Sequence, residues 1–385
     1  MNYRTCFAIA GWLATSAVMA DEPLLQLATF RADVTPSIGD GPCVGFMQKI
    51  ASVEHPLDLR GIVLRANGQT FVIAALDYQG LCNSSDDEFR RRMAEAAGTT
   101  PGRVALQSLH QHPAPVLDAD AMRLLHGDDT EPVRQHIAFT TQMAERTATA
   151  IREALPKLKP VVRVVGSRAK ADRLASNRRV PQADGSLLVL GSATRDPKLQ
   201  EAPEGLIDAM RRSARVASGG AMSESEKLDT TVDLRSLKPA GIAWDQSDLR
   251  FTVRDDGPFA AAALREQLQP GRPFNDRLKA AEFLAWANRL NAGHRVTVSR
   301  LKVGPLQLVH LPGEPFVEFQ LFAQQAADDS FVCVAGYGEC GVWYFGPDSI
   351  FRDRGGYGQT WSFTGSCQAA VETVLNQLVS PRKSQ

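Results

Sequence analysis

The alternation of apolar and polar positions along the chain predicts strands interleaved with helices. Two alternating runs, Leu59–Arg65 and Thr70–Leu76, flank Asn67-Gly68, a dipeptide that favours a two-residue hairpin turn. A helix is predicted over about 84–97, with acidic residues in its first turn and a glycine after its end. The run Arg103–Leu109 predicts a strand after that helix. The succession of strand, helix and strand indicates an α/β layer with a partly parallel sheet.

The rest of the chain continues this pattern. Further helices are predicted at 131–155, 315–327 and 368–378, and further strands at 30–35, 161–168, 294–302, 306–311 and 331–335. The segment from about 209 to 288 is rich in charges and helix-prone, and it predicts a polar, helical excursion. The predicted fold is therefore α/β, with mixed β-sheets and outer helices, in a single domain over 21–385.

The first twenty residues have the pattern of a secretory signal peptide. A positive charge at Arg4 is followed by an apolar stretch, Cys6–Val18, and by small residues before an acidic stretch that begins at Asp21. The sequence therefore predicts cleavage near Ala20 and a secreted or periplasmic protein. No later segment has the roughly 18 consecutive apolar residues that a transmembrane helix needs.

Charge and cysteine content narrow the picture further. Lys and Arg number 43, equal to the 43 Asp and Glu residues, so nothing in the net charge favours nucleic acid or an anionic membrane surface as a partner. Removing the signal peptide leaves five cysteines, so at least one is free or paired between chains. Cys333 and Cys340 lie close enough in sequence to bridge in an oxidising compartment. Neither the charge nor the spacing of the cysteines predicts an oligomeric state.

The segment Ser108-Leu109-His110-Gln111-His112 is the strongest candidate for chemistry. Residues i and i+2 of a strand point to the same face, so His110 and His112 are predicted to project together where the strand opens into a Pro-rich loop. Two imidazoles aimed at one place suit a metal ion, or a metal ion and its water. The alternative is a pair of hydrogen-bonded surface histidines.

Two further segments carry candidate residues. Glu314 follows a strand and a Pro-Gly turn at the mouth of a predicted helix, where a carboxylate is often a capping charge. The stretches 335–344 and 355–361 are rich in glycine and tyrosine. Glycines allow a backbone to approach a ligand closely, and a tyrosine hydroxyl can stabilise an oxyanion. The alternative is an ordinary loop packed with aromatic side chains.

Together these segments resemble the neutral/alkaline, non-lysosomal ceramidase family, in its N-terminal domain and its exported bacterial relatives. The resemblance begins at Phe30-Arg31-Ala32-Asp33-Val34-Thr35-Pro36 and runs through Ala74–Asp77. It is most specific at the two histidines and returns at Leu311-Pro312-Gly313-Glu314 and in the two tyrosine-rich stretches. It covers most of 28–208 and 290–378.

This resemblance implies a zinc-dependent amide hydrolase acting on a small-molecule or lipid N-acyl substrate, with a role in sphingolipid metabolism. By motif, His110, Glu314 and Tyr344 match zinc ligands. His112 matches a catalytic residue beside the metal and the substrate, and Tyr357 matches a catalytic tyrosine that polarises the scissile carbonyl. These roles agree with the chemistry of zinc and of oxyanion stabilisation.

The chain also departs from the family pattern. The family takes a further zinc histidine from a central strand, whereas no histidine occurs here between His136 and His294. The chain runs from Ala202–Asp208 directly into Ala209–Arg212, which resembles the helix that follows the missing block. A catalytic zinc normally has three protein ligands, so the site is expected to be incomplete. Two functions stay open: a zinc-dependent amidase, and an inactive relative that binds a ligand or partner.

Overall fold

The computed structural model describes residues 23–39, 49–170, 179–184, 186–189, 195–200, 210–217, 230–352 and 357–380. Its helices are α1 (Asn83–Ala97), α2 (Ala119–His126), α3 (Glu131–Ala154), α4 (Pro197–Gln200), α5 (Ala261–Gln267), α6 (Phe274–Asn291), α7 (Val317–Ala326), α8 (Tyr357–Thr360) and α9 (Gln368–Val379). The predicted signal peptide and its cleavage site lie outside the described residues.

Two large mixed sheets form the centre of the fold. The first has the strand order β5-β3-β2-β1-β7, made of β1 (Gln26–Asp33), β2 (Asp58–Ala66), β3 (Gln69–Leu76), β5 (Val104–Ser108) and β7 (Lys159–Pro160). The second has the order β13-β14-β15-β17, made of β13 (Ile242–Leu249), β14 (Val296–Val303), β15 (Leu306–His310) and β17 (Phe331–Ala335). The predicted α/β class, with mixed sheets and outer helices, is confirmed.

Smaller sheets complete the strand inventory of the described residues. A three-stranded sheet has the order β11-β8-β12, from β8 (Arg163–Lys170), β11 (Met210–Ala217) and β12 (Thr230–Asp233). Three two-stranded pairs join β4 (Gly80–Leu81) to β6 (Val116–Leu117), β9 (Arg179–Pro181) to β10 (Leu187–Val189), and β16 (Glu314–Pro315) to β18 (Tyr344–Phe345).

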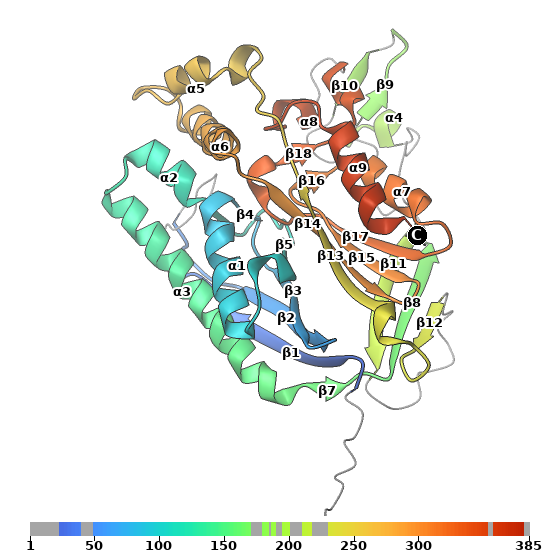
Figure 1. Ribbon diagram of the computed structural model, residues 1–385. Helices are drawn as coiled ribbons and strands as arrows, with labels where there is room; N and C mark the ends of the chain where they lie inside the picture. The colour runs from blue at the N-terminus through green and yellow to red at the C-terminus, as the bar shows by residue number, and fades with distance from the viewer. Residues whose placement is uncertain are drawn as a thin grey trace, which may run out of the picture.

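The core is layered because each sheet is apolar on both faces. Helices α1 and α3 cover the outer face of the first sheet, and α7 and α9 cover the second (Figure 1). Phe89 and Met93 of α1 are buried in the first of these layers. Between the two sheets, Leu64 and Phe71 of the first sheet share a buried cluster with Leu306 of the second. This burial of apolar surface is the main force that holds the layers together.

The first sheet follows the sequence prediction closely. Strands β2 and β3 pair antiparallel around Asn67-Gly68, whose φ angles of +50° and +68° are those a two-residue type I′ turn requires. Strand β3 then pairs parallel with β5 across the intervening helix α1. The predicted strand–helix–strand unit is confirmed, and it places the end of β5 beside the end of β3.

The segment predicted as helical over about 209–288 is only half helical. Its first part forms β11, β12 and β13, and only its second part forms α5 and α6. The interpretation of Ala209–Arg212 as a helix start was wrong, because Met210–Arg212 begins β11, which pairs with β8 along eight residues. Pairing with a distant strand overrides local helix propensity. The junction at 201–209 lies outside the described residues.

Two further features concern the cysteines and the surface. The bridge that the spacing of Cys333 and Cys340 would allow is not formed, and Cys340 carries a free, buried thiol whose pKa burial raises to about 12. No helix of the described residues is long and apolar enough to cross a membrane.

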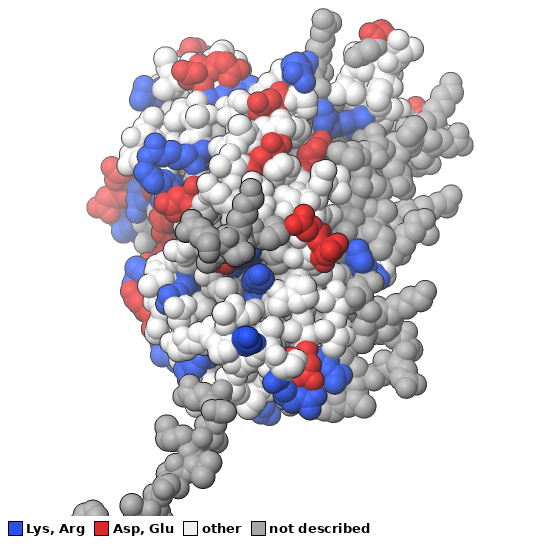
Figure 2. Space-filling view, turned by 45° about the vertical axis from the view of Figure 1, so that its right-hand side comes forward, with Lys and Arg blue, Asp and Glu red and all other residues white. Residues whose placement is uncertain are grey.

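On the face drawn in Figure 2, basic and acidic side chains are interspersed over the described residues.

Candidate functional site

The strand that leads to the two histidines ends earlier than predicted. Strand β5 stops at Ser108, and His110 adopts a left-handed backbone conformation with φ of +56°. The prediction that strand alternation aims His110 and His112 together was therefore wrong in its reason. Their rings nevertheless meet edge to face, with centroids 5.1 Å apart. The turn after β5, rather than the strand, brings the two imidazoles together.

The hydrogen bonds of His110 determine which of its nitrogens can bind a ligand. Its Nδ1 lies 2.7 Å from the backbone carbonyl oxygen of Gln79. Because a carbonyl only accepts, Nδ1 must carry the proton, and Nε2 then presents its lone pair. That Nε2 lies 3.4 Å from Oε1 of Glu314. Burial lowers the pKa of His110, and the neighbouring His112 lowers it further, so the neutral imidazole is favoured.

Glu314 is held by a short parallel ladder. It begins β16 and pairs with Tyr344 of β18, and its backbone N–H donates to the carbonyl of Trp343 at 2.8 Å. Glu314 is 5% exposed. The alternative role as a helix cap does not hold, because α7 begins at Val317 after Phe316 and no side chain caps it. The carboxylate instead lies with the imidazole of His110.

Unfavourable backbone conformations are concentrated around this pair. Tyr337 and Trp343 have φ of +59° and +52°, and both residues contact His110 through their rings. Left-handed conformations of such residues are rare, cost roughly 1–3 kcal/mol each, and persist where the surrounding structure enforces them. Strain of this kind often marks ligand-binding or catalytic sites, and here it surrounds the candidate residues.

Tyr337 is the residue that the sequence prediction missed. Its ring stacks on His110, with centroids 4.8 Å apart and an interplanar angle of 20°. Its backbone carbonyl accepts from the N–H of Ser108, which ties the tyrosine-rich loop to the end of β5. The sequence Gly336-Tyr337-Gly338 drew attention to this loop, but nothing in it distinguished Tyr337 from Tyr344.

The other predicted site residues are placed as follows. His112 is exposed beside His110. Tyr344 is half-buried and is the register partner of Glu314 in the β16–β18 pair. Tyr357 begins α8, and its side chain lies outside the part of the chain that the structure describes. The structure thus brings together His110, His112 and Glu314, with Tyr344 in the adjacent strand.

Gly313 provides a test of how tightly the ladder is built. Its φ is +43°, and an added Cβ would overlap the carbonyl oxygen of Trp343 and a methyl group of Val342. We expect Gly313→Ala to lower the free energy of unfolding by more than the roughly 1–2 kcal/mol of left-handed strain alone. Gly68→Ala is the matched control, since Gly68 has φ of +68° and open space around it. Urea unfolding measures both changes. Equal losses of unfolding free energy in the two variants would show that the β16–β18 pair can shift to accommodate the added methyl group.

The donor set fits a metal ion only in part. Two ligands about 2.0–2.1 Å from a tetrahedral zinc ion are roughly 3.3 Å apart, close to the spacing of His110 and Glu314. A third ligand is harder to find, because no group of three His, Cys, Asp or Glu side chains within the described residues could hold a metal. Tyr344 is the neighbouring candidate for that place. At this site the described residues therefore offer one strong pair of ligands rather than a complete set.

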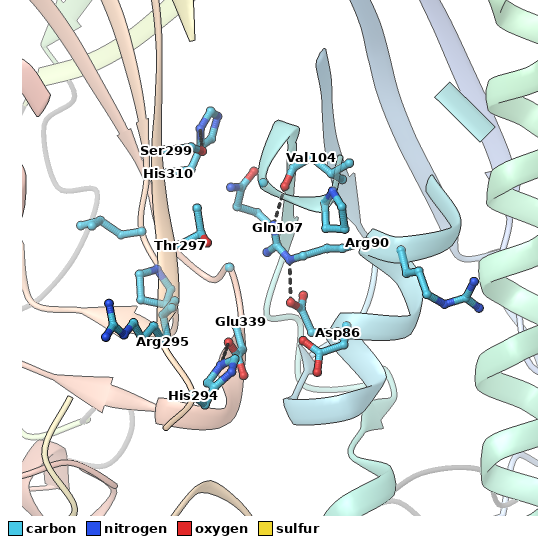
Figure 3. Close-up of a pocket in the computed structure, with 18 residues that line it drawn as sticks. Asp86, Arg90, Val104, Gln107, His294, Arg295, Thr297, Ser299, His310 and Glu339 are labelled. Carbon is cyan, nitrogen blue, oxygen red and sulfur yellow. Dashed lines mark hydrogen bonds and ion pairs between the residues drawn. The ribbon is translucent and has the colours of Figure 1, made fainter. Parts of the chain in front are cut away.

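A cavity of about 360 Å³ lies close to the same loops (Figure 3). It is lined by Leu311 and Pro312 and by Glu339, whose carboxylate pairs with His294 at 2.9 Å. The carbonyl of Glu339 accepts from the N–H of Gly313. His110 and Glu314 are absent from the lining of this cavity. We therefore do not interpret this cavity as the substrate site. Its lining residue Glu339 instead helps to hold the turn that precedes Glu314.

Comparisons with known proteins identify the fold. No family model matches the chain, and a search of curated protein sequences finds no relative. Solved structures do match. One, described as ceramidase complexed with C2, has a TM-score of 0.57 at 12% identity, with 94% of this chain and 77% of that chain covered. Another, neutral ceramidase from Pseudomonas aeruginosa, has a TM-score of 0.56 at 13% identity, with 95% and 76% covered. The ceramidase-like fold that the sequence resemblance predicted is confirmed.

Proposed function

We propose that the chain is a secreted hydrolase of N-acyl amides whose zinc site is incomplete. The observation that carries the proposal is the pairing of His110 Nε2 with Glu314 at 3.4 Å within a neutral ceramidase fold. The second nitrogen of His110 is fixed by the Gln79 carbonyl, the arrangement usual for histidines that bind metals. Similarity to a ceramidase complexed with C2 supports an N-acyl lipid or small molecule as the substrate class.

Each residue has a definite part in this proposal. His110 and Glu314 would hold the zinc, with Tyr344 as the third ligand. Zinc bound there would act as a Lewis acid toward an amide carbonyl and a water molecule. His112, exposed beside His110, can exchange a proton with the substrate or with solvent. By resemblance, Tyr357 donates a hydrogen bond to the developing oxyanion.

The incomplete ligand set also supports a second function. A tyrosine hydroxyl is a weaker ligand than a histidine or a carboxylate, and no third strong ligand lies within the described part of the chain. A relative that retains the fold and binds an N-acyl ligand without hydrolysing it would have such a site. The two functions differ in turnover rather than in ligand class.

An assay with short- and long-chain N-acyl substrates at saturating zinc distinguishes the two functions. We expect zinc-dependent hydrolysis slower than the ordinary range of about 1–1000 per second, because one strong ligand is missing. Hydrolysis should disappear in His110→Ala and persist in His126→Ala, a change at an exposed histidine on α2. Turnover within the ordinary range, lost with a chelator and restored by zinc, would refute an incomplete site. Binding without any turnover would establish the non-catalytic function.

A further inference from the structure

A second cavity, of about 400 Å³, lies between α5, α6 and α8. Its walls are largely apolar and include Phe259, Leu264 and Phe283. Two cationic side chains, Arg254 and Lys279, also line it. It belongs to a different part of the chain from the 360 Å³ cavity beside the Glu314 turn, with which it shares no lining residue. A pocket that combines aromatic walls with a buried arginine and a half-buried lysine is suited to an organic anion.

The two cations differ in how their charges are satisfied. Arg254 is 6% exposed and is fully engaged, since it pairs with Asp256 and donates to the carbonyls of Gln359 and Ser362. Its guanidinium also lies over the ring of Phe259, 3.4 Å from the centroid. Arg254 therefore serves as a fixed wall of the pocket, and its charge is already neutralised by Asp256.

Lys279 is the cation left available. Its Nζ lies 4.8 Å from the ring centroid of Trp361 and 6.0 Å from that of Phe259. Within the described part of the chain, its ammonium has no carboxylate at ion-pair distance and no hydrogen bond. Burial lowers the pKa of Lys279, and the neighbouring Arg254 lowers it further. A partly desolvated ammonium without a bonded anion gains most from one that enters the pocket.

The charges around the pocket indicate how many negative charges the ligand carries. Asp276 and Asp256 also line it, and both are exposed at its rim. Glu282 lies one turn from Lys279 and is buried, and burial raises its pKa well above the usual range. Two cations thus face two carboxylates. A singly charged ligand can pair with Lys279, whereas the second charge of a dianion would find no unpaired cation in the lining, because Arg254 is already paired with Asp256.

We propose that this pocket binds an organic carboxylate, with its charged end on Lys279 and its apolar body against Phe259 and Phe283. The site goes beyond the proposed hydrolase function and does not depend on zinc. It is nevertheless linked to the His110 site by a continuous series of rings. The ring centroids of Trp361 and Trp343 are 5.7 Å apart, and those of Trp343 and His110 are 6.3 Å apart. An occupant paired with Lys279 would therefore lie near Trp361, the first ring of this series.

The test is calorimetric titration of the mature chain with sodium octanoate, octanol and octyl phosphate. Octanoate should bind more tightly than the other two. Lys279→Gln should weaken octanoate binding about 10- to 100-fold, the effect of losing one charge-assisted hydrogen bond, and Lys279→Arg should retain it. Lys157→Gln, at an exposed lysine after α3, is the matched control and should bind as the unmodified chain does.

Thermal unfolding of each variant establishes that the pocket is intact before binding is compared. Octanoate that binds equally to the unmodified chain and to Lys279→Gln would overturn the proposal, and so would an absence of octanoate binding. Tighter binding of octyl phosphate than of octanoate would overturn the assignment to a carboxylate. Because each readout is binding, failure of the hydrolase assay leaves these outcomes unchanged.

Discussion

Replacing His110 with alanine is expected to abolish specific zinc binding by this chain. The Nε2 of His110 and Oε1 of Glu314 form the pair of candidate ligands that the described residues bring together after β5 and at β16. A site with three strong ligands can retain some zinc affinity when one ligand is removed. Here the removal of His110 leaves only the Glu314 carboxylate and the Tyr344 hydroxyl as candidate ligands. We expect the affinity to fall by more than about 100-fold, beyond the roughly 10- to 100-fold effect of losing only a supporting group.

Competition with a zinc-sensitive dye measures this change directly. The unmodified chain should already bind zinc more weakly than a site with three histidine or carboxylate ligands. Glu314→Gln should weaken binding to a similar degree, because an amide oxygen lacks the negative charge. His126→Ala, at an exposed and distant histidine, should have no effect. Tight, stoichiometric zinc that survives His110→Ala would mean that the ligands lie elsewhere in the chain.

The sequence predicted the parts of the fold that are specified locally. The β2–β3 hairpin follows from Asn67-Gly68, and the parallel pairing of β3 with β5 follows from the helix between them. Strand β13 could not be predicted in this way. Its residues Ile242–Leu249 include polar and acidic side chains and show no strong apolar alternation, and only the two end residues of the strand are buried. Its stability comes from pairing with β14, a contact that local sequence does not encode.

The candidate site shows the same division between local and distant information. Sequence pattern and resemblance selected His110 and Glu314, which are about two hundred residues apart and meet in the structure. They could not show that the Gln79 carbonyl fixes the tautomer of His110, nor that Tyr337 stacks on its ring. Both contacts depend on a left-handed turn at His110, a conformation that is uncommon for residues other than glycine and that the sequence therefore did not predict. The identity of the candidate ligands was therefore predictable from residue type, whereas the contacts that orient them were not.

A buried carboxyl group near α2 gives the second large effect. Asp118 is 1% exposed and caps α2 by accepting from the backbone N–H groups of Asp120 and Ala121. The side-chain amide of Asn83 also donates to it, at 2.7 Å. Burial raises the pKa of Asp118 from 3.8 to about 7, because these hydrogen bonds do not offset the loss of water around the charge. The nearby Glu282 is buried as well, and its pKa is also raised.

A raised carboxyl pKa makes the folded state less stable as pH rises. Between about pH 4 and pH 7, the unfolded chain releases the Asp118 proton while the folded chain retains it, so the free energy of unfolding falls through this window. Above about pH 7 the folded chain also releases the proton, and the contribution of Asp118 becomes constant. The direction is opposite to that of a salt-bridged surface carboxylate, which stabilises the protein as pH rises.

Asp118→Asn should therefore become progressively more stable than the unmodified chain as pH rises from 5 to 8, by about 2–3 kcal/mol over that range. The asparagine oxygen can still cap α2, and Asn83 can rotate its amide so that its otherwise unpartnered Oδ1 accepts from the new side chain. Urea unfolding at each pH measures the difference. Asp255→Asn, a change at an exposed aspartate, is the control and should show no such trend. A constant difference between Asp118→Asn and the unmodified chain across pH 5–8 would show that Asp118 does not retain its proton in the folded state.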